Sequence, residues 1–220
     1  MDRKKLLDYK FRKKLWQENI KNNDKNIKSL VDSALSKLKL DRKWKVFVIV
    51  SNFLAKKNSK MPPFDINSFS CTYLNVCSAK QGYEIVMFFN KARMSFLSKD
   101  ALQPLVLHES VHVKQAVANP EKYLMSAVDD DLSEELELEA EKESSKFDEF
   151  RKQMVLEMVL YSYDNFNGWK GAEKMVNFLY KDILTIYGPG YLRDMTKEEY
   201  EAFQEARRKK DIGLFVRCFI

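Results

Sequence analysis

The two histidines of the chain, His108 and His112, stand four positions apart, and Glu109 follows the first of them in the run LVLHESVHVK. In a helix this spacing puts both imidazoles on one face, one turn apart, so that they can bind the same metal ion. The carboxylate of Glu109 then projects beside the ion, where it can take a proton from water and pass it to a leaving amine. These residue types at this spacing indicate metal-assisted hydrolysis.

The surroundings of the motif favour a metal site over two incidental histidines. Random placement would give this spacing, with a glutamate after the first histidine, in roughly one of a thousand chains. The residues that flank the motif are apolar on nearly every side of the helix: Leu105, Val106, Leu107, Val111 and Val113. We expect such a helix to be buried, and a metal ion would satisfy the polar side chains that it carries into the core.

The HExxH motif with its uncharged flanks resembles that of the zincin metallopeptidases, and within them the gluzincin branch. The resemblance covers about residues 83–150 and implies an edge strand that binds an extended peptide, then the HExxH helix, then a helix that bears a glutamate ligand. The run YEIVMFF (83–89) resembles the family's edge strand. Lys114 departs from the family pattern, which usually has a hydrophobic residue at that place.

The resemblance implies a third ligand downstream, because a catalytic zinc site has three protein ligands and one open position. No third histidine exists in the chain, which excludes a metzincin-like ligand set. Glu137 fits the gluzincin pattern E-x-x-A-[D/N] best, since Ala140 follows three positions later with Glu141 in the last place. Glu141 would then orient a histidine as a hydrogen-bond acceptor.

Other ligands stay open at this point. In a rival register Glu141 is the ligand and Ser144 is the small residue, but Arg151 then falls on the buried side. Glu134 and Glu143 are further alternatives in the same acidic segment. Cysteine thiolates bind zinc as well, although a carboxylate on a following helix is the family's common solution.

A complete site of this kind implies a zinc metallopeptidase, a hydrolase that cleaves peptide bonds with metal-activated water and with Glu109 as general base. Gluzincins also hold the oxyanion with a tyrosine or a histidine, and this chain has no spare histidine. The downstream candidates are Tyr161, Tyr163, Tyr187 and Tyr191. For any one of them, packing between helices is the simpler explanation.

Helices and strands must position these residues, and the hydrophobic pattern predicts them in two blocks. Before residue 98 we expect two amphipathic helices and three strands: helices 2–19 and 25–39, and strands 44–53, 70–76 and 83–89, the last two as a hairpin. After residue 98 we expect four helices, the first of which ends at Asn119-Pro120: 98–118, 131–163, 168–187 and 196–210. The predicted fold is helix-rich α+β, with a small, mostly antiparallel sheet packed against the HExxH helix and the glutamate-bearing helix.

The length of 220 residues and the hydrophobic content of 45% suit one zincin-like domain over 1–220. Residues 1–40 are expected to form a basic helical N-terminal extension of that domain. The apolar tail that ends in Cys218-Phe-Ile is expected to dock on the body, although a thiolate there could also reach the metal.

The net charge of +6 hides an uneven distribution. Residues 1–60 carry 18 Lys and Arg against 6 Asp and Glu, whereas residues 129–150 carry 2 against 11. The basic section can make weak contact with nucleic acid or acidic protein, although a solvated lysine-rich surface is the plainer explanation. The alternative function is therefore a zincin-fold regulatory or nucleic-acid-binding module with little proteolytic activity. A purely structural zinc site is disfavoured, because such sites normally use four Cys or His ligands.

The expected location is the cytoplasm. The first twenty residues contain no continuous apolar run of the kind a signal peptide has. No segment reaches the roughly 18 apolar residues that a membrane helix needs. The three cysteines form no C-x-x-C pair, and an odd number fits a reducing compartment better than a disulfide framework.

Overall fold

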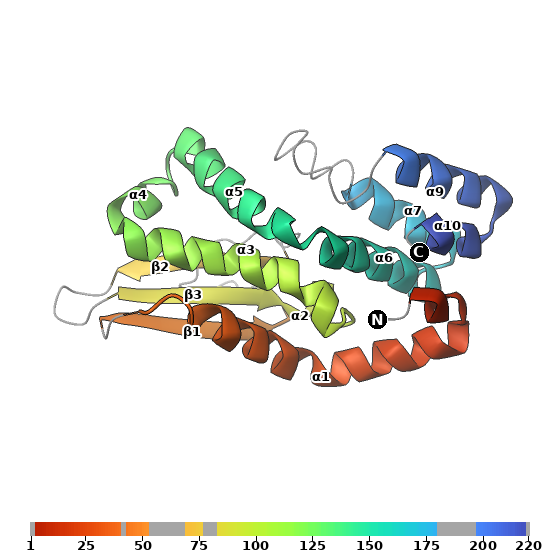
Figure 1. Cartoon of the computed structure of the whole chain (residues 1–220), viewed down its shortest axis with the longest axis horizontal. Coiled ribbons are helices and arrows are strands. Elements are labelled where there is room, and N and C mark those ends of the chain that lie inside the picture. Colours follow the sequence, from red (N-terminus) through yellow and green to blue (C-terminus); the bar gives the residue numbers. More distant parts are fainter. Residues whose placement is uncertain (1–2, 41–42, 53–68, 77–82, 180–196, 219–220) are drawn as a thin grey trace. The chain divides into compact units, whose positions relative to one another are not determined.

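The computed structural model describes residues 3–40, 43–52, 69–76, 83–179 and 197–218, which form two compact units (Figure 1). Unit 1 comprises residues 1–22, 96–102 and 147–220, and unit 2 comprises residues 23–95 and 103–146. Helices α1 (Tyr9–Leu35) and α3 (Lys99–Ala118) contribute residues to both units. Whether the units act as the single domain that the sequence predicts stays a prediction. No helix within the described ranges is both long and apolar enough to cross a membrane.

Within the described ranges the sheet of unit 2 has three strands in the order β1-β3-β2, which are β1 (Trp44–Ser51), β3 (Tyr83–Asn90) and β2 (Ser70–Val76). Strand β3 pairs antiparallel with β2 but parallel with β1. The α+β class is as predicted, but the sheet is mixed, so the expectation of a mostly antiparallel sheet is correct only for the β2–β3 pair. The hairpin pattern predicts that pair, whereas the place of β1 depends on a long-range pairing that no local pattern encodes.

Strand β3 lies in the middle of the sheet, and residues 85–90 are all buried. A continuous apolar run such as YEIVMFF is typical of a strand that is covered on both faces. The assignment of this run to a peptide-binding edge is therefore wrong, because strands are paired on both sides of it. The edge strand next to the motif helix is β2, since the Thr72 hydroxyl donates a hydrogen bond to Glu109 of α3.

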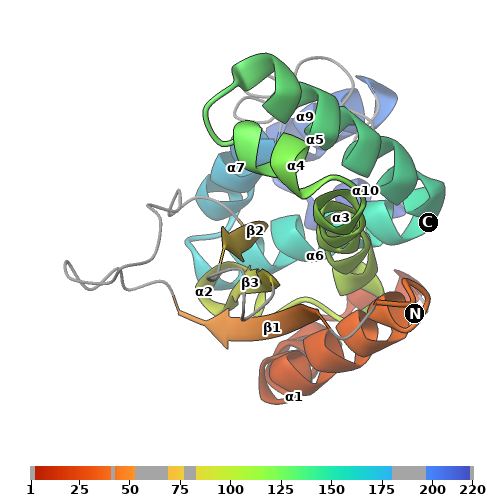
Figure 2. The ribbon, with the colours of Figure 1, turned by 90° about the vertical axis from the view of Figure 1, so that its left-hand side faces the viewer.

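Helix α3 carries the motif and lies along the sheet, as the two views at right angles show (Figures 1 and 2). Its bounds agree with the predicted helix 98–118. Val106, Val111 and Val113 are buried, as expected for a helix that is apolar nearly all round. Asn119 ends the helix, and its side chain accepts a hydrogen bond from the main-chain N–H of Lys122. This cap starts the short helix α4 (Pro120–Met125).

The glutamate-bearing helix is shorter than predicted. The chain forms α5 (Asp130–Ser144), a 3-10 turn η2 (Ser145–Phe147) and α6 (Asp148–Asn165) in place of one helix over 131–163. At the break the Ser144 hydroxyl donates to the main-chain oxygen of Glu141, a local bond that competes with the regular helix ladder. Within α5 one side of the helix is buried, with Leu136, Ala140 and Ser144 at helical spacing.

The N-terminal segment forms a 3-10 turn η1 (Arg3–Leu7) and the single long helix α1, so the prediction of two helices, at 2–19 and 25–39, is wrong. The helix continues through the polar residues between the two predicted helices, because the buried asparagines there make hydrogen bonds. Asn19 donates to the main-chain oxygen of Phe96 in unit 1, and Asn23 donates to that of Met94 in unit 2, just after β3 in helix α2 (Lys91–Met94). Residues 9–35 thus pack within each unit, and the prediction that residues 1–40 form an extension of the domain stays a prediction.

Three further helices belong to unit 1: α7 (Trp169–Asn177), α9 (Lys197–Lys209) and α10 (Ile212–Cys218). The first two agree with the predictions over 168–187 and 196–210, except for residues 180–196, which lie outside the described ranges. The tail docks as predicted, because Phe215 and Val216 are fully buried and the ring of Phe215 lies 5.2 Å from that of Phe203. The side chain of Cys218 is outside the described part.

Candidate metal centre

The two histidines of α3 face the same point. The i, i+4 spacing brings their ring centroids to 4.8 Å, and the two Nε2 atoms lie 3.1 Å apart. His112 is buried, whereas 16% of the His108 side chain is exposed. The pair is thus held in the core with one side open towards solvent.

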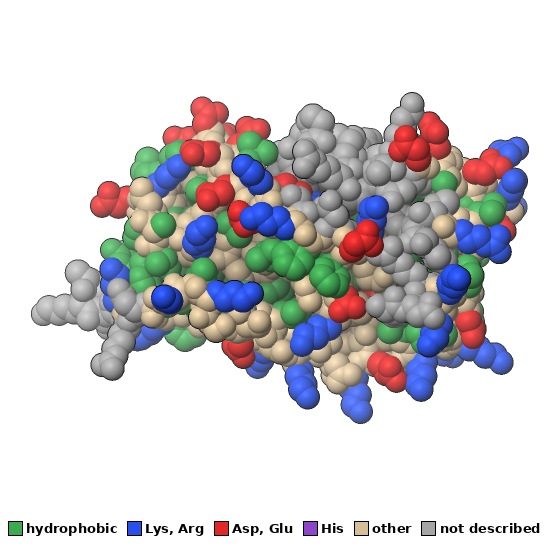
Figure 3. Space-filling model, viewed as in Figure 1, with side chains coloured by type: hydrophobic (Ala, Val, Ile, Leu, Met, Phe, Trp, Pro, Cys, Tyr) green, Lys and Arg blue, Asp and Glu red, His purple; other side chains and the backbone are tan. Residues whose placement is uncertain are grey.

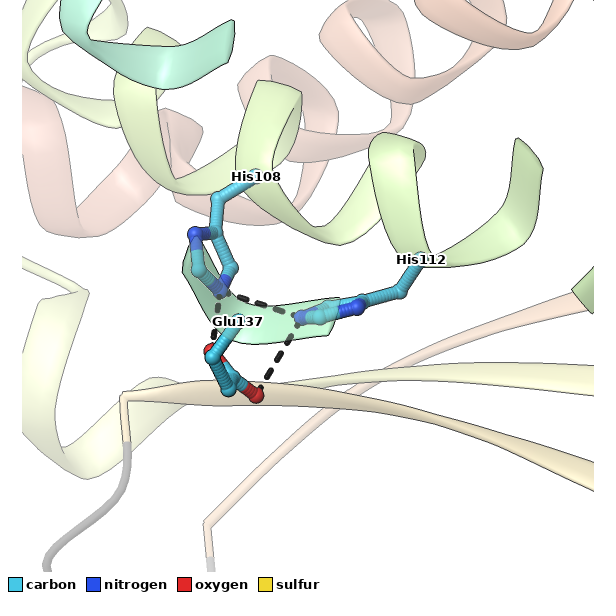
Figure 4. A group of neighbouring side chains, drawn as sticks. All are labelled: His108, His112 and Glu137. Carbon is cyan, nitrogen blue, oxygen red and sulfur yellow. Dashed lines mark hydrogen bonds and ion pairs between the residues drawn. The ribbon is translucent and has the colours of Figure 1, made fainter. Parts of the chain in front are cut away.

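Glu137 of α5 completes the group (Figure 4). One carboxylate oxygen lies 3.1 Å from Nε2 of His108, and the other lies 3.4 Å from Nε2 of His112. The side chain of Glu137 is 28% exposed. Two nitrogens and a carboxylate at these distances need a cation between them, and that cation can be a proton or a metal ion.

The three donor groups are close enough to share one metal ion. Zinc binds histidine nitrogen and carboxylate oxygen at about 2.0–2.2 Å, so neighbouring donor atoms around it lie roughly 3.3 Å apart. The two Nε2 atoms lie 3.1 Å apart, and their distances of 3.1 and 3.4 Å to Glu137 end at different carboxylate oxygens. One donor atom from each residue lies within 4.8 Å of the others. Two imidazoles and one carboxylate also form the donor set of a catalytic zinc site, which keeps a fourth position open.

Gln115, one turn after His112, fixes the orientation of that ring. Its side-chain oxygen lies 2.8 Å from Nδ1 of His112, while its nitrogen donates to the main-chain oxygen of Leu136 and to Glu139. Because the amide nitrogen is used in this way, the oxygen faces Nδ1 and accepts its proton. In the neutral imidazole Nε2 of His112 then carries the lone pair, which is available to a metal ion once the proton of the site has left. We expected Glu141 to orient a histidine, but His112 is oriented by Gln115.

The other carboxylates considered as ligands lie elsewhere. Among the described residues, Glu137 is the carboxylate that lies together with both histidines within ligand distance. Glu141 is buried on the same helix but is not part of this group. Glu134 is exposed, and Glu143 pairs with Lys146 at 2.6 Å. The structure thus brings together the set that the sequence favours, and its role in binding metal stays a prediction.

The charges of the site favour a cation. Burial alone would lower the pKa of His112, but the hydrogen bond and the charge of Glu137, together with the charge of Glu109, raise it to about 9. Burial would likewise raise the pKa of Glu137, yet hydrogen bonds from both histidines hold it well below its usual range. Without a metal ion the site therefore holds a proton, and a metal ion must displace that proton to bind.

Glu109 of the motif is held by the edge strand β2. Its side chain is almost fully buried, and one carboxylate oxygen accepts a hydrogen bond of 2.6 Å from the Thr72 hydroxyl of β2. Cys71 precedes this threonine, and burial together with the charge of Glu109 raises the pKa of its thiol far above the usual value. A thiol that stays protonated is a poor metal ligand, which disfavours Cys71 as part of the site.

A pocket of about 240 Å³ opens beside the candidate ligands in unit 2. Strand β2, helix α4, the turn after it and helix α5 line it, with the residues Thr72, Tyr73, Leu74, His112, Tyr123, Leu124, Ser126, Ala127, Ser133, Leu136 and Glu137. Its volume is below the roughly 300–1,000 Å³ of pockets that take a whole small ligand, so it fits a few groups of a larger molecule. Apart from the candidate ligands, the lining carries no charged side chain.

Tyr123 lines this pocket together with His112 and Glu137. Its OH donates to the main-chain oxygen of Thr72 at 2.8 Å, and its ring centroid is 6.2 Å from that of His112. Burial, followed by the charges of Glu109 and Glu137, raises its pKa well above the usual value, so the phenol stays protonated.

The tyrosines that the sequence suggested as oxyanion donors have other surroundings. The ring of Tyr161 stacks on that of Phe96 within unit 1, with 3.8 Å between centroids, and Tyr163 packs edge-on against Trp169. Both have the packing role that we named as the simpler explanation. Tyr187 and Tyr191 lie outside the described residues.

Sequence reasoning missed three residues of the site. Gln115 could have been found, because it lies three positions after His112 and so shares its helix face. Thr72 and Tyr123 could not, since their place at the site depends on which strand forms the sheet edge and on how α4 folds back to it. Comparison with known proteins found no matching protein-family model, curated protein or solved structure.

Proposed function

We propose that the chain is a zinc-dependent metallopeptidase of the gluzincin type. The observation that carries this proposal is the group of His108, His112 and Glu137, whose donor atoms lie within 4.8 Å of one another, with Glu109 close enough for its charge to raise the pKa of His112. A glutamate directly after the first histidine is the feature that separates a hydrolytic site from a structural one, because only the former needs a base.

Zinc bound by these residues would act as a Lewis acid on the peptide carbonyl and would make water more acidic. Glu109 takes a proton from the attacking water as its oxygen bonds to the carbonyl carbon. It then gives the proton to the amide nitrogen as the C–N bond breaks, so that one water and one peptide bond yield a carboxylic acid and an amine. Thr72 holds one oxygen of Glu109 through this exchange.

Strand β2 supports a peptide as the substrate. It is an edge strand of the described sheet, and residues 72–74 line the pocket next to the candidate ligands. An extended chain can pair with the outer main-chain groups of such an edge and place its side chains in adjoining pockets. The resemblance to zincins implies the same arrangement, with β2 in the place that we first gave to residues 83–89.

The test is zinc content together with peptide cleavage. The chain, purified without chelators, should hold about one zinc and cleave unfolded casein or a mixture of fluorogenic peptides. Glu109→Gln should keep the zinc and lose activity by at least about 100-fold. The matched control Glu134→Gln removes an exposed carboxylate from α5 and should match the wild type.

The same assay distinguishes the two ligand registers. Glu137→Gln should lose zinc, whereas Glu141→Gln should keep it. A wild-type chain that binds no zinc, or that binds it and cleaves none of these substrates, would overturn the proposal.

A nucleic-acid-binding module is the second candidate, and the surface of α1 favours it. On the face drawn in Figure 3, lysines line this helix while carboxylates gather over α4 and α5. The exposed lysines of α1 include five that fall at helical spacing along one side: Lys10, Lys14, Lys21, Lys25 and Lys28. Binding to DNA that weakens steeply with salt, and that is unchanged in Glu109→Gln, would support this function. Absence of such binding at low salt would exclude it.

A further inference from the structure

The outer edge of β2 can be read from its pairing with β3. Ser70 lies opposite Phe89, and the main-chain oxygen of Phe69 accepts from the N–H of Asn90 at 2.8 Å. In an antiparallel pair the main-chain groups point to the partner at every second residue. Residues 69, 71, 73 and 75 therefore face β3, whereas Thr72 and Leu74 direct their main-chain N–H and C=O away from the sheet.

The side chain of Tyr123 is hydrogen-bonded to one of these outward main-chain groups. Its phenol donates to the main-chain oxygen of Thr72 at 2.8 Å, in the place that an N–H of an added strand would take. The phenol thus competes directly with any peptide that pairs along this part of the edge. Leu74, two residues further along, also lines the pocket.

Thr72 connects this contact to the reacting groups. Its carbonyl oxygen holds Tyr123, and its hydroxyl holds Glu109. Tyr123 lines the same pocket as His112 and Glu137, so a phenol released from Thr72 is already next to the candidate ligands. Because the hydroxyl group lies among buried groups, it must find another acceptor when it leaves the strand.

We propose, on the basis of the proposed peptidase function, that Tyr123 is a catalytic hydroxyl donor that the substrate itself releases. A peptide that pairs with β2 supplies an N–H to the oxygen of Thr72 and displaces the phenol. The phenol then donates its hydrogen bond to the carbonyl oxygen of the scissile peptide, where negative charge develops. The switch exchanges one hydrogen bond for another and makes or breaks no covalent bond.

This arrangement predicts opposite effects of Tyr123→Phe on the two kinetic constants of a fluorogenic peptide that the wild-type enzyme cleaves. The kcat should fall by about 100-fold or more, the usual effect of losing one oxyanion donor. The KM should fall several-fold, because no phenol competes for Thr72. Tyr163→Phe removes a hydroxyl from the aromatic packing of unit 1 and serves as the matched control. Zinc content and the unfolding midpoint of each variant show that the site and the fold are retained.

A binding measurement tests the release without turnover. Zinc-loaded Glu109→Gln should bind the same peptide, and the double variant with Tyr123→Phe should bind it several-fold more tightly by calorimetry. An unchanged kcat in Tyr123→Phe overturns the proposal. Weaker peptide binding also overturns it, since Tyr123 would then only fasten α4 to β2. If the wild type cleaves no peptide, the proposed function fails instead, and the zinc-loaded chain still shows by titration whether the phenol competes with a peptide.

Discussion

Two buried polar clusters of this protein differ in how fully their donors and acceptors are satisfied. In unit 1, Arg12 binds both oxygens of Asp164 at 2.7 Å and the main-chain oxygen of Leu6 at 2.8 Å, while Trp16 donates to the same carboxylate. Both charged side chains are only 3% exposed. This bidentate pair is closed, since each charge already has its counter-charge.

By the same criterion the cluster of unit 2, formed by His108, His112 and Glu137, is open. Two imidazole nitrogens and a carboxylate meet at one point, and the proton that they share there must be displaced when a metal ion binds. The ring of His112 is fixed from behind by Gln115, and the front adjoins the pocket. Burial and charge alone therefore do not identify a functional site. Ligand groups that share only an exchangeable proton, next to a pocket, are the better sign.

The largest effect should come from breaking the closed cluster. Asp164→Ala leaves the buried guanidinium of Arg12 without its counter-charge, and we expect the free energy of unfolding to fall by about 3–5 kcal/mol. Zinc content should not change. Urea unfolding measures the loss, and Glu173→Ala, which removes the exposed partner of Arg207, should cost no more than about 1 kcal/mol. Equal losses in the two variants would contradict the view that Arg12–Asp164 is a structural pair.

A buried glutamate of unit 1 should make the stability of the protein depend on pH. Glu157 in unit 1 accepts hydrogen bonds from the Ser98 N–H and from Gln153, both neutral groups, and burial raises its pKa to about 7. The folded state therefore disfavours the charged form, and stability is fully present below the unfolded pKa of 4.5. It is lost as the pH rises through about 7, by an amount on the order of 2–3 kcal/mol.

Unfolding by urea at a series of pH values checks this effect. In Glu157→Gln the fall between about pH 5 and 7 should be absent, because no carboxyl group is left to ionise. The same slope in both proteins would show that Glu157 does not titrate in this range.

The smallest effect should come from Gln115, which orients His112 in the cluster of unit 2. Gln115→Ala removes the acceptor for Nδ1 of His112, and we expect zinc affinity to fall by about 10–100-fold. Competition with a chromogenic chelator measures it. Gln115→Glu, which keeps an oxygen for that proton, should recover most of the affinity. Wild-type affinity in Gln115→Ala would mean that the ring is held by its packing alone.

Much of the candidate site could be predicted because its main parts are local. The spacing of His108 and His112 is a property of one helix, and Asn119-Pro120 marks where that helix ends. The choice of Glu137 among many carboxylates came from the family pattern and from the small residue Ala140. The acidic composition of the segment alone would not have separated it from Glu134.

The parts that could not be predicted depend on contacts between distant segments. The order β1-β3-β2 follows from pairing across the chain, so the edge strand could not be assigned from the run 83–89 alone. The single helix α1 depends on carbonyl groups that accept from Asn19 and Asn23. Propensity favoured a break at that polar run, and these buried hydrogen bonds overrode it.

The central place of β3 also has a consequence for synthesis. Strands β1 and β2 leave the ribosome first, and in the described sheet neither pairs with the other, so that both lack their neighbour in this sheet until residues 83–90 follow. At roughly 5–20 residues per second the wait after β2 is on the order of a second. During that interval β1 is without the strand that it pairs with in the folded sheet, and the histidine-bearing helix α3 has not yet been made.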